Sequence, residues 1–351
     1  MDKEIAPLVV RCGAMGDMVL VLSLVEALYR RFGSPVDVLS SGGWTRPLLE
    51  QQPAVGQVFL LGSRKTPYLF SAAQRELVAQ LRDRGVGPAW IADRGEFVPR
   101  LLRRAGISAA WQLHVARDCP FQDGEQYCDR FVRFAQMTPA GLRDAATIDP
   151  MGLADLRVPP LHVLPPWRED LARWLRSRDL DGPPLYLVQA GNKRTMRWWA
   201  PQRRASNTKY WPEENWAQVI ATMLGLNSAA HVILLGVPAE AALTDRIVQA
   251  AGSPRVHNAA AELPMARLLA LQERAAGMIS VDTGPAHSGA ALDCPLVVLF
   301  GEADPVRYAP RSPAGRVEIV VRPAGATPGV ATITVDAVRA AWQRLLQSVD
   351  H

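Results

Sequence analysis

Short apolar runs alternate along the chain with longer segments whose apolar residues follow helical spacing. Runs of strand length occur at residues 7–10, 36–39, 58–61 and 90–92, and again at 185–189, 231–235, 277–281 and 296–300. Between them the spacing i, i+3, i+4, i+7 predicts helices, as for Val21, Leu24, Val25 and Leu28. Buried strands that alternate with helices predict an α/β fold, with parallel sheets covered by helices on both faces.

The strand and helix pattern stops and restarts near the middle of the chain. Residues 158–166 are proline-rich, a helix is predicted over 167–177, and Asp-Gly-Pro-Pro stands at 181–184. A chain of 351 residues also exceeds one ordinary domain. We therefore predict an N-terminal domain over 1–165, a linker over 166–184, a C-terminal domain over 185–335 and a terminal amphipathic helix over 336–351. The two domains are expected to be similar and to have a cleft between them.

Composition excludes several classes of protein. No apolar run reaches the roughly 18 residues of a membrane span, and residues 1–10 lack the apolar core of a signal peptide. The four cysteines show no CxxC spacing and the six histidines are not paired at ligand spacing, so we expect free thiols in a reducing cytosol and no metal site. The net charge of +5 favours anionic partners, such as phosphorylated substrates or an acidic membrane surface.

The segment from Asp282 to Ser288 is the most informative motif. It follows the strand at 277–281 and begins a helix, so it places Asp282, Thr283, the backbone of Gly284 and His287 at one strand end. Ligands bind at this edge of open α/β sheets, and anions favour helix N-termini. Simple helix capping would explain Asp282 or Thr283 but not His287. The segment therefore favours a ligand site.

A second turn carries a carboxylate near the other end of the chain. Gly13-Ala-Met-Gly-Asp17 follows the first strand and begins a helix, but it does not match the dinucleotide motif G-x-G-x-x-G. Asp17 is either a helix-capping residue or a general base that faces a substrate. The local sequence leaves both interpretations open.

Residues 191–212 form a long loop that is rich in basic and aromatic residues. Phosphate contact and base stacking with nucleic acid are one explanation, and a solvated loop is another. Because the patch is a single loop and the net charge is low, a clamp for a phosphorylated or lipid-linked substrate is more economical. We expect no nucleic-acid partner.

Two charged residues stand at further strand ends of the C-terminal half. Lys209 comes just before a helix that begins with Pro212 and Glu213, where its ammonium and backbone N–H groups can converge on a diphosphate. Glu240 follows the strand at 231–235. Its carboxylate could bind a ribose or an adenine amine, or could stabilise the N-terminus of the next helix.

Together these motifs resemble the heptosyltransferases of glycosyltransferase family 9, which transfer heptose from ADP-heptose to the inner core of lipopolysaccharide. The resemblance covers most of the chain in order. The matching segments are residues 11–18, 91–96, 209–216, 236–240, 281–287 and 299–305, and Glu302 stands where the family usually has proline.

The resemblance implies a GT-B fold, which has two Rossmann-like domains with the acceptor at the first and the nucleotide-sugar at the second. The terminal helix is then expected to pack back on the N-terminal domain. It also implies an inverting transferase in which Asp17 is the general base. The residues that it assigns to the donor are Lys209, Glu240, Asp282, Thr283, Gly284, His287 and Gly191.

The acceptor is less well defined by the resemblance. The acceptor-binding residues that we expect are Gly16, Met18, Arg94, Arg194 and Arg197. The expected partners are an ADP-sugar donor and an anionic or lipid-linked glycan acceptor, and no metal or other cofactor is required. The protein is expected in the cytoplasm, where peripheral contact with the inner membrane is compatible with such an acceptor.

Two other functions fit the same sequence. One is transfer of a different nucleotide-sugar to a polysaccharide, a natural product or a protein. The other is a nucleic-acid or regulatory binding module that uses a GT-B scaffold without catalysis and contacts its partner through the basic loop.

Overall fold

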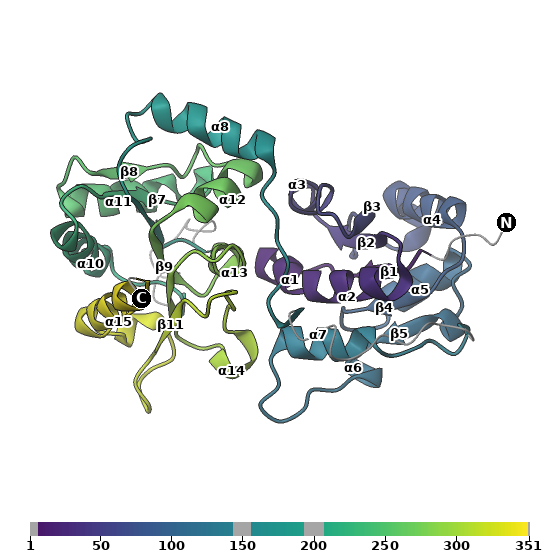
Figure 1. Ribbon diagram of the computed structural model, residues 1–351. Helices are drawn as coiled ribbons and strands as arrows, with labels where there is room; N and C mark the ends of the chain where they lie inside the picture. Colours follow the sequence, from purple (N-terminus) through teal and green to yellow (C-terminus); the bar gives the residue numbers. More distant parts are fainter. Residues whose placement is uncertain (1–5, 143–155, 193–206, 350–351) are drawn as a thin grey trace. The chain divides into compact units, whose positions relative to one another are not determined.

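The chain folds into two compact units, Met1–Leu161 and His162–His351. The computed structural model describes residues 6–142, 156–192 and 207–349 (Figure 1). Each unit contains one parallel β-sheet with helices packed around it. This arrangement confirms the predicted α/β fold class.

The N-terminal unit is built on a five-stranded sheet of order β3-β2-β1-β4-β5, in which every neighbouring pair is parallel. Its elements are β1 (Leu8–Val10), α1 (Met15–Leu20), α2 (Leu22–Phe32), β2 (Val36–Ser41), α3 (Thr45–Leu49), β3 (Val55–Leu61), η1 (Tyr68–Phe70), α4 (Ala72–Arg84), β4 (Ala89–Ile91), α5 (Phe97–Arg104), η2 (Ala109–Trp111), β5 (Gln112–His114), α6 (Val115–Asp118) and α7 (Tyr127–Ala135).

The central strand β1 is buried on both faces, as its apolar run predicts. Helix α2 turns the predicted apolar face inward, so that Leu24, Val25 and Leu28 are all buried. It ends at Gly33, whose φ of 67° is the left-handed conformation that glycine adopts without a steric penalty. The short turn between β1 and α1 therefore lies at the carboxyl edge of a well-packed sheet.

The C-terminal unit is built on a six-stranded parallel sheet of order β11-β10-β9-β6-β7-β8. Its elements are α8 (Pro165–Arg176), β6 (Leu185–Gln189), α10 (Glu213–Leu226), β7 (His231–Leu234), η5 (Pro238–Glu240), α11 (Ala241–Ala251), β8 (Val256–Asn258), α12 (Met265–Arg274), β9 (Gly277–Val281), α13 (Gly284–Ala291), β10 (Leu296–Phe300), α14 (Pro305–Tyr308), β11 (Val317–Val321), η6 (Val330–Thr332) and α15 (Val335–Val349).

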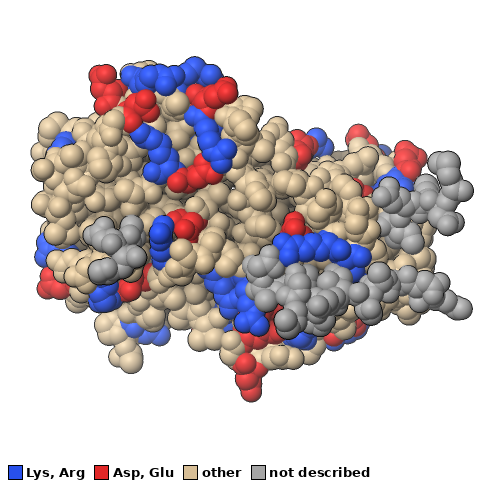
Figure 2. All heavy atoms as spheres, in the orientation of Figure 1, with Lys and Arg blue, Asp and Glu red and all other residues tan. Residues whose placement is uncertain are grey.

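Helix α8 occupies much of the stretch that we expected to be a linker. It packs against α12 in the C-terminal unit, where Trp167, Leu171 and Trp174 are buried. Basic and acidic side chains alternate over this helix pair (Figure 2) and form the ion pairs Arg168–Glu273, Arg178–Glu262 and Arg267–Asp170. The helix agrees with the one predicted over 167–177, and its apolar face packs on α12.

Helix α15 completes the C-terminal unit, and its expected packing on the N-terminal domain stays a prediction. It contacts β10, β11 and α10. The ring of Trp342 is fully buried and meets Tyr186 edge to face, with 5.0 Å between ring centroids. The apolar face that the sequence predicts is thus used within its own unit.

We expect Trp342→Ala to destabilise the C-terminal unit by about 3–5 kcal/mol, because it removes a fully buried indole and leaves a cavity. Urea unfolding followed by circular dichroism measures the effect. Gln343→Ala, on the exposed face of the same helix, is the control and should change stability by less than about 0.5 kcal/mol. Equal midpoints for the two variants would contradict the role of α15 as part of this core.

Across the residues that the structure describes, no helix is both long enough and apolar enough to cross a lipid bilayer.

Candidate functional site

Three of the predicted donor positions come together at one edge of the C-terminal sheet. Strands β9, β6 and β7 are consecutive neighbours, and all three run parallel. Asp282 follows β9, Gly191 follows β6 and Glu240 follows β7, so they lie at the carboxyl edge. This is the edge at which open α/β sheets bind ligands.

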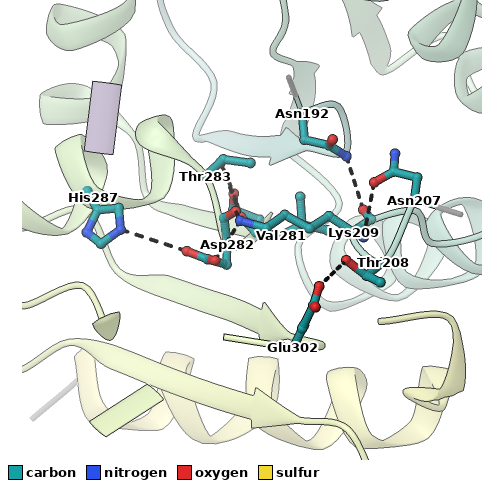
Figure 3. A network of polar contacts seen from close by, with 10 residues as sticks. Asn192, Asn207, Thr208, Lys209, Val281, Asp282, Thr283, His287 and Glu302 are labelled. Atoms are coloured by element: carbon teal, nitrogen blue, oxygen red, sulfur yellow. Dashed lines mark hydrogen bonds and ion pairs between the residues drawn. The ribbon is translucent and has the colours of Figure 1, made fainter. Parts of the chain in front are cut away.

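The most direct contact at this edge joins Lys209 to Asp282 (Figure 3). The Lys209 ammonium donates to the backbone carbonyl and to the Oδ2 atom of Asp282, at 2.6 Å in each case. An ammonium has three N–H donors, and these two contacts use two of them. The pair therefore fixes the position of a cation that can still donate to an anionic ligand.

His287 lies on the opposite side of the Asp282 carboxylate (Figure 3). Its Nε2 atom is 3.8 Å from Asp282 Oδ1, and both side chains are buried. The hydroxyl of Thr283 donates to the Val281 carbonyl at 3.2 Å, which ties it to the end of β9. Thr283 and Gly284 consequently present the N-terminus of α13, where backbone N–H groups favour an anion.

A turn before α10 positions Lys209. The Asn207 side chain accepts the Lys209 N–H at 3.2 Å, and the Asn207 carbonyl accepts the Tyr210 N–H at 2.9 Å. Thr208 donates to Glu302 Oε2 at 2.8 Å, which connects this turn to the loop after β10. The lysine is therefore held from its backbone as well as through its ammonium.

Glu213, which lies with Lys209 in the matching segment 209–216, has a structural role. It accepts hydrogen bonds from the Tyr210 hydroxyl and from Arg246 Nε, the latter at 2.8 Å. Burial alone would raise the pKa of Glu213, but these two donors hold its pKa below the usual value. The carboxylate thus joins the start of α10 to α11.

Glu240 lies against the backbone at the ends of β6 and β7. Its side chain is buried, and Oε2 accepts the Val237 N–H at 3.1 Å, which is a helix-start contact. A Cβ added to Gly191 would come within 2.4 Å of Glu240 Oε1, so glycine is required there for the close approach. The capping role is therefore present, and a nucleoside contact stays a prediction.

In the N-terminal unit, Asp17 lies in the first turn of α1. Its Oδ2 atom accepts the Ala14 N–H at 2.8 Å, while Oδ1 forms an ion pair with Arg11. Arg11 also donates to the Ala92 carbonyl at 2.6 Å. The Asp17 side chain is 32% exposed, so a substrate can reach it. Both interpretations of Asp17 are compatible with this geometry, and Arg11 is a partner that the sequence did not reveal.

Asp93 contacts residues that follow other strands of the same sheet, next to the turn that carries Asp17. It is buried, accepts the Cys12 N–H at 3.0 Å and pairs with Arg64 at 2.5 Å. Burial and the nearby Asp93 charge raise the pKa of the Cys12 thiol to about 12, so this cysteine is a neutral thiol. It is therefore unsuited to act as a nucleophile beside Asp17.

The predicted acceptor residues are placed differently from one another. Arg94 is exposed beside Asp93. Gly16 and Met18 are buried within α1, and the Met18 side chain is wholly inaccessible, so it belongs to the core and cannot contact an acceptor in this conformation. Arg194 and Arg197, with most of the basic loop, lie outside the described residues.

A basic pocket that the sequence did not predict lies in the N-terminal unit. Its volume is about 330 Å³, and its lining includes four cations and two aromatic rings, namely Arg64, Lys65, Arg100, Arg104, Tyr68 and Phe97. The Arg104 guanidinium lies 4.6 Å from the centroid of the Tyr68 ring. None of the described residues that line this pocket is acidic, so it suits an anionic ligand.

A metal site is not evident at either place. Within residues 6–142, 156–192 and 207–349, no group of three or more His, Cys, Asp or Glu side chains is arranged to hold an ion.

Known proteins provide an independent comparison. Residues 187–330 match the sequence profile of glycosyltransferase family 9 (heptosyltransferase). The chain is 23% identical over 318 residues to lipopolysaccharide heptosyltransferase 2 of Salmonella typhimurium, which covers 86% of this chain and 84% of the relative. These matches agree with the motifs at Lys209, Glu240 and Asp282.

Solved structures show the same fold. The ADP-heptose lipopolysaccharide heptosyltransferase II of E. coli superposes with a TM-score of 0.71 at 19% identity, over 99% of this chain and 100% of that one. A family 9 glycosyltransferase of Veillonella parvula gives a TM-score of 0.75 at 17% identity, over 98% and 99%. The predicted resemblance and the GT-B class, with two Rossmann-like domains, are confirmed: the chain is similar to the heptosyltransferases of glycosyltransferase family 9.

Proposed function

We propose that this protein is an inverting glycosyltransferase that moves a heptose from ADP-heptose to a hydroxyl of an anionic acceptor such as the lipopolysaccharide core. The observation that carries the proposal is the Lys209–Asp282 pair at the N-terminus of α13. It fixes a cation and backbone N–H groups at one point, which is what a leaving diphosphate requires. The E. coli structure with this fold is named for ADP-heptose, which supports that donor.

The proposed reaction is a single displacement. Asp17 takes the proton of the acceptor hydroxyl, and that oxygen forms a bond to the anomeric carbon of the heptose. The bond from this carbon to the diphosphate breaks, and ADP leaves with the electron pair. Lys209 and the N–H groups of Thr283 and Gly284 stabilise the charge that develops on the diphosphate. Attack opposite to the leaving group inverts the anomeric configuration.

The geometry supports distinct tasks for the donor residues. Asp282 is itself anionic, so we propose that it acts on the donor by holding Lys209 and not by direct contact with the diphosphate. His287 closes the far side of this carboxylate. Glu240 and Gly191 would contact the nucleoside at the neighbouring strand ends.

On the acceptor side, the proposal is supported by Asp17, whose side chain is 32% exposed in the turn after β1 and is paired with Arg11. The basic pocket lined by Arg64, Lys65, Arg100 and Arg104 would bind anionic groups of the acceptor. The basic loop that suggested a nucleic-acid module lies outside the described residues.

The deciding experiment combines donor binding with transfer. Purified protein is titrated with ADP-heptose and with other nucleotide-sugars in a calorimeter, and is then incubated with ADP-heptose and a heptose-free lipopolysaccharide core. We expect preferential binding of ADP-heptose and a product heavier by one heptose in mass spectrometry. Tight binding of another nucleotide-sugar without any binding of ADP-heptose would reassign the donor.

We expect Gly191→Ala to raise the Kd for ADP by about tenfold, because the new methyl group would displace the Glu240 carboxylate. Calorimetric titration with ADP measures the change. Gly182→Ala is the matched control, since a Cβ at Gly182 meets open space. An unchanged Kd in Gly191→Ala would remove Glu240 and Gly191 from the proposed nucleoside site.

A further inference from the structure

Two large apolar side chains are exposed side by side in the N-terminal unit. Leu69 is 77% exposed and Phe70 is 80% exposed, more than any other large apolar residue of the described chain. They are consecutive residues of the short helix η1. Single exposed apolar residues are ordinary on protein surfaces. An exposed leucine next to an exposed phenylalanine forms an apolar patch, and such patches are typical of binding surfaces.

The loop that carries this pair is fixed by hydrogen bonds. The Gln74 side chain donates to the carbonyls of Ser63 and Thr66, at 2.7 and 2.9 Å. Arg75 donates to the Leu69 carbonyl at 2.6 Å, and Ser71 caps α4 by accepting the Gln74 N–H. The backbone therefore holds the two apolar side chains outward, and little conformational freedom would be lost when they bind.

Positive charge surrounds the apolar pair. Residues 62–75 include Arg64, Lys65 and Arg75 and contain no acidic residue. Helix α5 adds three arginines without an acidic residue, and Arg104 packs on the Tyr68 ring beside the pair. The acidic groups near this surface include Asp93, which pairs with Arg64, the α4 residues Glu76 and Asp83, and Glu96 at the start of α5.

We propose that η1 and these cations form a docking surface for an anionic phospholipid bilayer. Leu69 and Phe70 would enter the boundary between headgroups and acyl chains, while Lys65, Arg75 and the α5 arginines would remain at the headgroup phosphates. Apolar side chains flanked by basic residues bind bilayers in this way, and each cation near an anionic surface adds to the affinity. Because the residues around the apolar pair are basic, an anionic bilayer fits this surface better than a neutral apolar partner does.

This inference deepens the proposed function, because a lipid-linked acceptor would be presented at such a surface. Its basis is nevertheless separate from the donor site. Binding to vesicles requires neither ADP-heptose nor transfer, so a failure of one proposal can be told from a failure of the other.

The test is cosedimentation of the full chain with vesicles of phosphatidylcholine, alone or with phosphatidylglycerol. We expect binding to the anionic vesicles only, and weaker binding at high salt. The double substitution Leu69→Ser with Phe70→Ser should lower the partition coefficient at least tenfold, and Lys65→Gln should lower it about fivefold. Val86→Ser, at a residue that is 56% exposed in the same unit, should have no effect.

A second measurement does not depend on the double variant. Phe70→Trp should show tryptophan quenching by brominated acyl chains beyond that of the wild-type protein. Equal wild-type binding to neutral and anionic vesicles, or full binding by the double variant, would overturn the proposal. So would a wild-type dimer in sedimentation velocity that becomes monomeric in the double variant, because the occupant would then be a second copy of the chain.

Discussion

Asp17→Asn is expected to lower kcat by about 10²–10⁴-fold and to leave the Kd for ADP-heptose nearly unchanged. The amide keeps the size of the side chain, and its carbonyl can still accept the Ala14 N–H. It cannot take a proton from the acceptor hydroxyl. Because the proposed donor residues all belong to the C-terminal unit, donor affinity should be insensitive to this change. Release of ADP in the presence of acceptor gives kcat, and calorimetry gives the Kd.

The control for Asp17→Asn is Glu26→Gln. Glu26 lies on α2 in the same unit and pairs with Arg30 on the surface, so this variant makes the same change in charge away from the turn. It should retain wild-type kcat. If Asp17→Asn also retained turnover, Asp17 would have only a structural role through Ala14 and Arg11, and the base would have to be another group.

The strands that the sequence predicted and the strands that it missed differ in their burial. Strands β6, β9 and β10 have the bounds that their apolar runs predicted, since each lies inside the sheet and is buried throughout. Strands β5, β8 and β11 were not predicted, and all three are edge strands. In β8 the residues are Val256, His257 and Asn258, and such a short polar run has no periodicity to detect.

The grouping of the proposed donor residues at one sheet edge could be predicted because each of them follows a buried strand or begins a helix. The sequence could not reveal that Lys209 and Asp282 would be in contact, since 73 residues separate them and the sheet order decides the pairing. For the same reason Asp93 was seen only as part of a motif, although it contacts Cys12 and Arg64. These contacts follow from β1 lying between β2 and β4, an order that a single sequence does not determine.

The residues of the proposed acceptor side were harder to predict, because they do not form a sequence motif. Met18 was among the expected acceptor residues, but its side chain lies in the core. The basic pocket draws Arg64 and Lys65 from one loop and Arg100 and Arg104 from α5. These cations, which are separated in the sequence, form one surface only because the loop packs beside α5.

The second large effect is expected at Lys209. Lys209→Gln should lower kcat/KM by about 10²–10³-fold and should also weaken the binding of ADP. The substitution removes the fixed cation, and it leaves the Asp282 carboxylate without its partner beside the developing charge of the diphosphate. Arg316→Gln is the matched control, because Arg316 also pairs with an aspartate, Asp293, at the opposite edge of the same sheet. It should change neither quantity.

A double-mutant cycle separates the two roles proposed for this pair. If Asp282 acts by holding Lys209, then Asp282→Asn should weaken ADP binding in the wild-type background and have little further effect in Lys209→Gln. Coupling energies between residues in contact are about 0.5–3 kcal/mol, which calorimetric Kd values resolve. Additive losses would show instead that each residue meets the diphosphate or its sugar independently. The proposed donor site depends on a cation that a carboxylate positions at the start of α13. The double-mutant cycle tests this feature directly.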